Sequence, residues 1–161
     1  MSDHPRGTKA AATLAFAALL AATSACATAS GPPAPAQGMS DGAASYLARI
    51  RAESGLAALQ PSPALEKAAR EQAGYMAGSG RMRHSTGFGR DFSSRLRQNG
   101  IRGPAAENVA HGQQDLEALF AAWMKSSGHR SNMLGASYGH FGLAKSTGQD
   151  GRLYWALVLG P

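Results

Sequence analysis

Cysteine is almost absent from this sequence, since Cys26 is the only one among 161 residues. A single cysteine cannot form a disulfide within the chain, so the folded part depends on its hydrophobic core. Acidic residues are also scarce, with 10 against 16 lysines and arginines, and the formal net charge is +6. Such a balance favours anionic partners such as phosphate, lipid head groups or acidic glycans.

The apolar run over residues 10–25 is too short for a membrane-spanning helix, which needs roughly 20 residues. It follows the basic residues Arg6 and Lys9 and ends in small residues before Cys26, which is typical of a secretory signal. Residues 1–25 are therefore predicted to be a lipoprotein-type signal peptide, with Cys26 as the lipidated first residue of an exported, membrane-anchored protein. Cleavage near residues 27–29, followed by secretion, is the alternative. Export argues against a nucleic-acid partner.

The rest of the chain divides into a short linker and one domain. Residues 26–39 are mainly small residues, proline and glutamine without an apolar period, and are predicted to be a flexible tether. Within the domain, residues 40–161, apolar side chains recur at helical spacing over 43–50, 65–76 and 116–123. Strands are predicted at 106–110, at 141–144 from period-two alternation, and at 153–159 from a run covered on both faces. Helices first and strands last indicate an α+β fold with helices on both sides of a small sheet.

Residues 107–134 carry the candidate site. Glu107 opens this stretch, and a helix capped by Asp115 follows. Gly128 is predicted to end that helix and to let His129 project from a turn. A side chain at the end of a rigid helix, with a carboxylate from a separate segment, is a common way to build a site. Asn108 and Asn132 are expected to bond the backbone in nearby turns.

Several short motifs occur in one order between residues 43 and 160. They are Arg51 with Gly55-Leu56 and Leu59, the helix at 65–76, Met82-Arg83-His84-Ser85, Ala106-Glu107-Asn108-Val109-Ala110, residues 123–134, Gly142-Leu143-Ala144 and Tyr154-Trp155. With these motifs the chain resembles the short bacterial branch of the CAP superfamily. That superfamily, also called SCP-like, includes cysteine-rich secretory proteins, antigen 5 and plant pathogenesis-related 1 proteins. The pattern Trp-x-x-Ser-x-Gly-His-Arg-x-Asn-Met-Leu after Glu-Asn-Val-Ala is the most specific part.

The resemblance implies a three-layer α-β-α sandwich with a small, mostly antiparallel sheet. It also implies a shallow cleft lined by two histidines and two acidic residues. Carried over to this sequence, His84, His129 and Glu107 supply three of these groups, and Ser126 replaces the second acidic residue. This replacement argues against a mechanism that needs paired carboxylates.

Three kinds of function are open to this cleft. His84 and His129 suit Zn²⁺ or another divalent cation, with Glu107 as a third ligand, as a partner of one imidazole or as a base. Alternatively, Glu107 orients His129 and the three residues only brace the fold. A hydrolase would use Ser126 or Ser127 with one histidine and Glu107, although the sequence has no Gly-x-Ser-x-Gly elbow. The third kind is a binding module for lipid or a partner, as attributed to some family members.

We expect a monomeric extracytoplasmic binding module, with a metal-assisted or Ser/His-type hydrolase as the alternative. Its expected ligand is a lipid or an anionic component of the cell envelope. The reason is a basic stretch opposed only by Asp91, although this stretch can also be read as a solvated helix face. The stretch contains Arg81, Arg83, Arg90, Arg95, Arg97 and Arg102.

Overall fold

The structure, a computed structural model, describes residues 1–2 and 34–161. Most of the predicted signal peptide, the lipidation site Cys26 and the tether up to residue 33 lie outside the described residues. These assignments therefore stay predictions. Within the described part, no helix has both the length and the apolar character needed to cross a bilayer.

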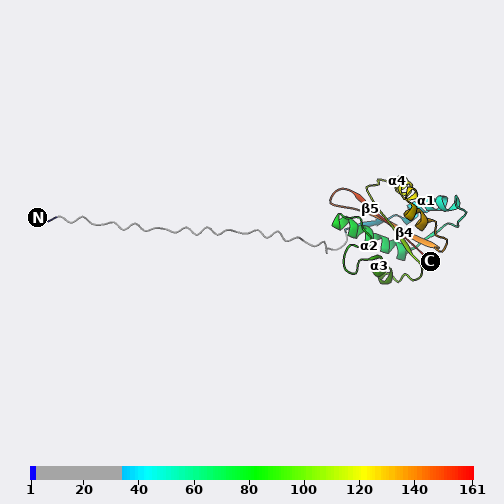
Figure 1. The fold of residues 1–161 in the computed structure, drawn as a ribbon, viewed down its shortest axis with the longest axis horizontal. Helices are drawn as coiled ribbons and strands as arrows, with labels where there is room; N and C mark the ends of the chain where they lie inside the picture. The colour runs from blue at the N-terminus through cyan, green and yellow to red at the C-terminus, as the bar shows by residue number, and fades with distance from the viewer. Residues whose placement is uncertain (3–33) are drawn as a thin grey trace.

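Five helices and five strands make up the described fold (Figure 1). The helices are α1 (Ser40–Ala52), α2 (Pro63–Ser79), α3 (Phe92–Gln98), α4 (Leu116–Lys125) and α5 (Ser127–Met133). The strands are β1 (Ala36–Gly38), β2 (Gln60–Pro61), β3 (Ala106–His111), β4 (His140–Thr147) and β5 (Leu153–Gly160). The sheet has the order β1-β4-β5-β3 with antiparallel neighbours, and the short β2 pairs parallel with β4. β3 therefore forms one edge.

The central strand β5 separates two hydrophobic cores. Trp155, Leu157 and Leu159 pack against α1, α4 and α5, whereas Tyr154, Ala156 and Val158 pack against α2. Because successive side chains of a strand point to opposite faces, one strand serves both cores. The predicted three-layer α-β-α arrangement is therefore confirmed, and β5 is covered on both faces as its apolar run indicated.

The best-predicted helix ends are set by local chemistry. The Ser62 side chain accepts a hydrogen bond from the Leu65 amide, and Pro63 occupies the first turn of α2. Gly80 ends α2 in the left-handed conformation, with φ 63°. Asp115 accepts from the Ala118 amide at 2.8 Å and begins α4 as predicted.

Three predictions are wrong in detail. The end of the predicted flexible tether 26–39 is part of the domain, because β1 at residues 36–38 pairs with β4. β4 does not alternate between buried and exposed residues, because helices cover both of its faces. Gly128 does not end α4. Instead Ser126 separates α4 from α5, so His129 lies on a second short helix rather than on a turn.

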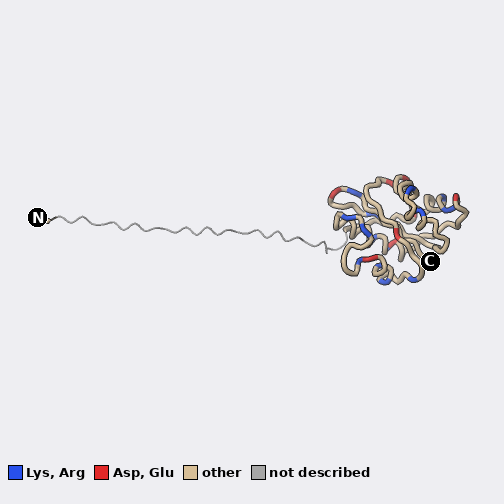
Figure 2. The backbone as a smooth tube through the Cα atoms, in the orientation of Figure 1, with Lys and Arg blue, Asp and Glu red and all other residues tan. Residues whose placement is uncertain are grey.

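The basic stretch 81–102 is not uniformly solvated. Figure 2 shows basic segments at the α3 end of the molecule, and Asp91 is the one acidic residue in the sequence of this stretch. Arg81, Arg83 and Arg97 are exposed, but Arg95 has no exposed surface. Arg95 is therefore excluded from the surface that an anionic ligand could reach.

α2 approaches β4 at very short range, as its alanines suggested. Ala68, Ala69 and Ala73 are fully buried. A Cβ atom added to Gly142 of β4 would lie 2.0 Å from the backbone nitrogen of Glu66. Only glycine fits at this position, because the obstacle is backbone and cannot rotate away.

We expect Gly142→Ala to lower the free energy of unfolding by about 1–3 kcal/mol or more, since it overpacks the α2–β4 contact. Urea unfolding followed by circular dichroism measures this loss. Gly42→Ala is the matched control, because its Cβ would meet Leu116 at an ordinary 3.7 Å. Equal stability of the two variants would contradict the close approach.

Candidate functional site

The residues of the candidate site lie along the outer edge of the sheet. Among the described residues, β3 pairs only with β5, and no described strand lies along its other edge. Glu107 and Asn108 are successive residues of β3 and point to opposite faces of the sheet. Glu107 meets the α2–α3 loop, which carries His84, and Asn108 meets α5, which carries His129. The two histidines thus reach the same edge from opposite layers.

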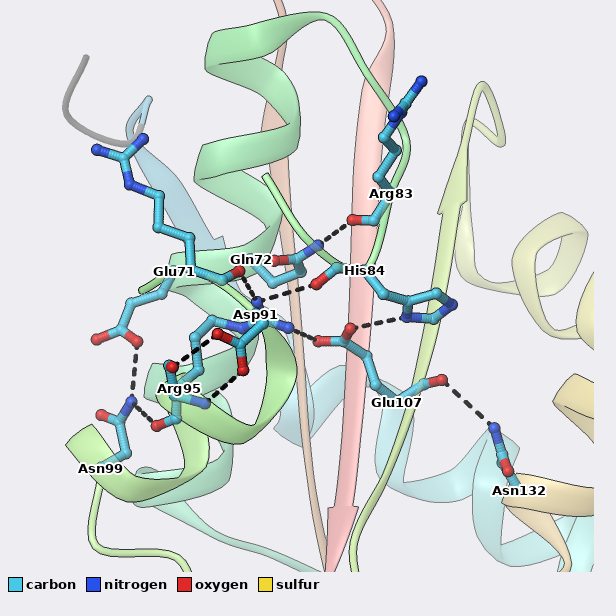
Figure 3. Close-up of polar contacts among 11 residues, drawn as sticks. Glu71, Gln72, Arg83, His84, Asp91, Arg95, Asn99, Glu107 and Asn132 are labelled. Atoms are coloured by element: carbon cyan, nitrogen blue, oxygen red, sulfur yellow. Dashed lines mark hydrogen bonds and ion pairs between the residues drawn. The ribbon is translucent and has the colours of Figure 1, made fainter. Parts of the chain in front are cut away.

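Glu107 is the buried centre of the site, with 6% of its surface exposed. One carboxylate oxygen accepts from Arg95 Nη2, and the other lies 2.9 Å from Nδ1 of His84 (Figure 3). Arg95 and Glu107 form an ion pair shielded from water. Such a pair needs both members, because either charge alone would be buried without compensation.

Arg95 also fixes the loop that carries His84. Its Nη1 donates to the carbonyl oxygens of His84 at 3.3 Å and Arg90 at 2.6 Å. Gln72 of α2 donates to the carbonyl of Arg83. The loop is therefore tied to buried side chains on both sides of His84, and its geometry does not depend on loop residues alone.

α5 is held against β3 by two asparagines. Asn108 Nδ2 donates to the carbonyl of His129 at 3.0 Å. Asn132 Nδ2 donates to Asn108 Oδ1 at 2.8 Å and to the Glu107 carbonyl at 3.3 Å. The expectation that these residues serve only nearby turns is wrong, since each reaches more than twenty residues along the chain.

Arg51 holds the other end of α5, and its role was not foreseen. This buried side chain donates to the carbonyls of Met133 at 2.9 Å and Gly135 at 3.0 Å, and to Ala57 at 2.7 Å. A cation at the carbonyl end of a helix is favourable. One signal was available: Arg51 follows Leu47 by four positions, on the buried face of α1.

The two histidines have opposite electrostatic environments. The hydrogen bond to Glu107 raises the pKa of His84, although burial works against it. Burial lowers the pKa of His129, and the nearby charge of His84 lowers it further. Since Glu107 occupies Nδ1 of His84, Nε2 is the ring atom left for a ligand. His129 is neutral near pH 7 and keeps a lone pair for a ligand.

The site offers fewer free donor side chains than a metal site with three protein ligands needs. Both carboxylate oxygens of Glu107 are engaged, so this residue is a partner of His84 and not a free ligand. Among the described residues, no group of three or more His, Cys, Asp or Glu side chains could hold a metal. The suggestion that Glu107 orients His129 is also wrong, since it contacts His84.

Ser126 stands at the position of the second acidic residue, but the helix ends do not hold its side chain in place. It lies between α4 and α5 with φ −95° and ψ 120°, and its side chain makes no capping hydrogen bond. Its backbone amide donates to the Trp123 carbonyl. The hydroxyl is therefore not oriented by the helix ends.

Comparison with known proteins decides the family. The family model for cysteine-rich secretory proteins, CAP, matches residues 44–159. The chain belongs to the CAP family. The uncharacterized protein YkwD of Bacillus subtilis (strain 168) is 36% identical over 95 residues, which cover 58% of this chain and 37% of YkwD. The matched region thus spans little more than a third of that relative.

Two solved structures share the fold. An outer surface protein from Borrelia burgdorferi has a TM-score of 0.67 at 21% identity, over 74% of this chain and 90% of its own. An extracellular protein containing a SCP domain from Bacillus anthracis str. Ames has a TM-score of 0.65 at 20% identity, over 75% and 40%. The predicted family and its α+β fold are confirmed.

The opposite environments of the two imidazoles can be measured by NMR titration of the ring protons. We expect the pKa of His84 to lie above, and that of His129 below, the ordinary value for histidine. Glu107→Gln removes the main cause for His84, so its pKa should fall. His84→Asn removes a neighbouring charge, so the pKa of His129 should rise. Unchanged values in both variants would contradict the proposed network.

A double-mutant cycle tests the buried ion pair. Arg95→Met and Glu107→Gln should each lower the free energy of unfolding by about 3–5 kcal/mol, because each leaves a buried charge unpaired. The double variant should lose clearly less than the sum, as measured by urea unfolding. Arg70→Met, which breaks an exposed pair with Glu66, should cost at most about 1 kcal/mol. Additive losses would refute the coupling.

Proposed function

We propose that this chain is an exported binding module that acts outside the cytoplasm, with His84 and His129 as its ligand site. One observation carries the proposal: Glu107 holds Nδ1 of His84 and leaves Nε2 of this exposed ring for a ligand. The signal-like residues 1–25 support export, and so do the similar proteins, whose names describe an outer surface protein and an extracellular protein.

A divalent cation such as Zn²⁺ would be held by two imidazoles. Glu107 would act behind His84, where a carboxylate fixes the ring tautomer and orientation of a metal ligand. Because no third protein donor is available among the described residues, the remaining positions would be filled by water or by a bound molecule. This donor set suits a cation that links the domain to a ligand better than a preformed structural zinc site.

The charges around the cleft favour an anionic ligand. Arg83 and Arg130 are exposed and stand next to His84 and His129 in the chain. An acidic lipid or another anionic component of the cell envelope fits this setting. Lipidation at Cys26 would keep a monomeric domain close to such a ligand.

A hydrolase remains the alternative function of the same cleft. Two histidines whose pKa values are shifted in opposite directions resemble an acid and base pair. Against this, Glu107 is already neutralised by Arg95, and Ser126 lacks an oriented hydroxyl. Binding therefore explains more of the site than catalysis does.

Calorimetric titration with Zn²⁺ tests the ligand site. We expect residues 27–161 to bind one Zn²⁺ in the micromolar range, and His84→Ala/His129→Ala to lose this binding. His111→Ala/His140→Ala is the matched control, because these imidazoles contact Tyr154 and the Pro161 carbonyl away from the cleft. Binding that survives in the cleft variant, or no binding in the unmodified protein, would overturn the metal proposal.

A further inference from the structure

The loop between α2 and α3 carries exposed large apolar side chains. Within residues 34–161, the exposed large hydrophobic residues are Met82, at 43%, and Phe88, at 106%. Both belong to this one loop. Phe88 stands between Gly87 and Gly89, whose φ angles are 149° and 66°. Neither glycine has a side chain that could cover the aromatic ring, so Phe88 protrudes fully into solvent.

Exposed cationic side chains lie in the same loop and in the helix that follows it. Arg81 and Arg83 are exposed on the same loop, and Arg97 is exposed on α3. The only acidic residue between positions 80 and 102 is Asp91, and its carboxylate caps α3 by accepting from Ser94. Figure 2 shows the resulting excess of basic over acidic segments at the α3 end of the molecule. The tip therefore combines an uncovered aromatic ring with an excess of basic over acidic residues.

We propose that the 81–90 loop docks the domain on an anionic lipid surface, with Phe88 inserted among the lipids and the arginines on the phosphates. An aromatic or aliphatic residue with nearby Lys or Arg is the usual chemistry of proteins that lie on a membrane. Anionic lipids attract basic side chains at short range, and salt weakens this attraction. This role does not require a ligand in the cleft.

The shape of the loop favours a bilayer over a protein partner. A protein would need a pocket matched to Phe88, with apolar contacts around it to exclude water. Here the flanking residues are glycines, which provide no such rim. A bilayer accepts a protruding ring without a matched surface, because its hydrocarbon is fluid.

The point of entry of the chain fits this orientation. Ala34 donates its amide to the Gly74 carbonyl, and Ala34 and Ala36 pack with Phe92 and Leu96 against the α2 core. The 33 residues that precede Ala34 therefore join the domain on the α2–α3 layer, the layer from which the loop projects. Any attachment through that segment would therefore join the domain on the side that carries the loop.

Vesicle co-sedimentation of residues 27–161 tests the proposal. This fragment lacks the predicted signal and Cys26 but keeps every residue of both hydrophobic cores. We expect binding to phosphatidylglycerol/phosphatidylcholine vesicles, weakening with added salt, and little binding to phosphatidylcholine alone. Phe88→Ser should lower the partition coefficient about tenfold or more. Its melting temperature should not change, because Phe88 is exposed.

Three further variants separate docking from unspecific charge attraction. Arg81→Ser/Arg83→Ser should weaken vesicle binding, whereas the control Lys125→Ser/Arg152→Ser removes the same charge elsewhere and should not. Phe88→Trp should show a blue shift of its emission on anionic vesicles and quenching by brominated lipids.

Three results would overturn the proposal. They are wild-type partitioning of Phe88→Ser, an equal loss in the Lys125/Arg152 control, and no vesicle binding by the unmodified fragment. The last result would point to a protein or glycan partner for Phe88. Zn²⁺ binding should persist in Phe88→Ser, so failure here and failure of the cleft proposal are distinguishable.

Discussion

The buried ion pair between Arg95 and Glu107 is the interaction on which the cleft depends. Removing two charges from water is costly, and their attraction repays this cost only with good geometry and further hydrogen bonds. Here Arg95 also donates hydrogen bonds to the carbonyls of His84 and Arg90. Glu107 also forms a hydrogen bond with the imidazole of His84. One pair thus determines both where the loop runs and which nitrogen of His84 faces outward. A hydrophobic pair could fill the space but could not orient the ring.

The opposite wall of the cleft is built on another principle, the capture of backbone carbonyls by neutral and cationic side chains. Asn108 donates a hydrogen bond to the carbonyl of His129, and Asn132 donates one to the carbonyl of Glu107. Arg51 donates to the carbonyl of Met133 at the end of α5. An edge strand such as β3 presents unpaired backbone groups that invite another strand. The bond from Asn132 satisfies one of these groups. The contacts that hold α5 therefore also protect the edge, which joins site geometry to fold stability.

Sequence reasoning succeeded where the determinant was local. The helix ends at Ser62, Gly80 and Asp115 involve amides or carbonyls within one turn, so the neighbouring residues in the sequence were enough to predict them. His84 and Glu107 came from the family resemblance, and they do meet. Arg95 and Arg51 were not recognised, because an arginine is exposed in most contexts and only tertiary packing buries it. Their helical spacing from Phe92 and Leu47 was the available hint. The break at Ser126 was missed because Gly128 is the more usual terminator.

The same network bears on the proposed choice between ligand binding and acid–base chemistry. A general base must lie within hydrogen-bond reach of the proton that it abstracts. Both carboxylate oxygens of Glu107 are engaged by Arg95 and His84, so neither oxygen is left to reach a substrate proton. The second acidic position is Ser126, so no other carboxylate can take over the role. The site offers one imidazole on a loop that Arg95 holds and one on α5, which supports the proposed binding role.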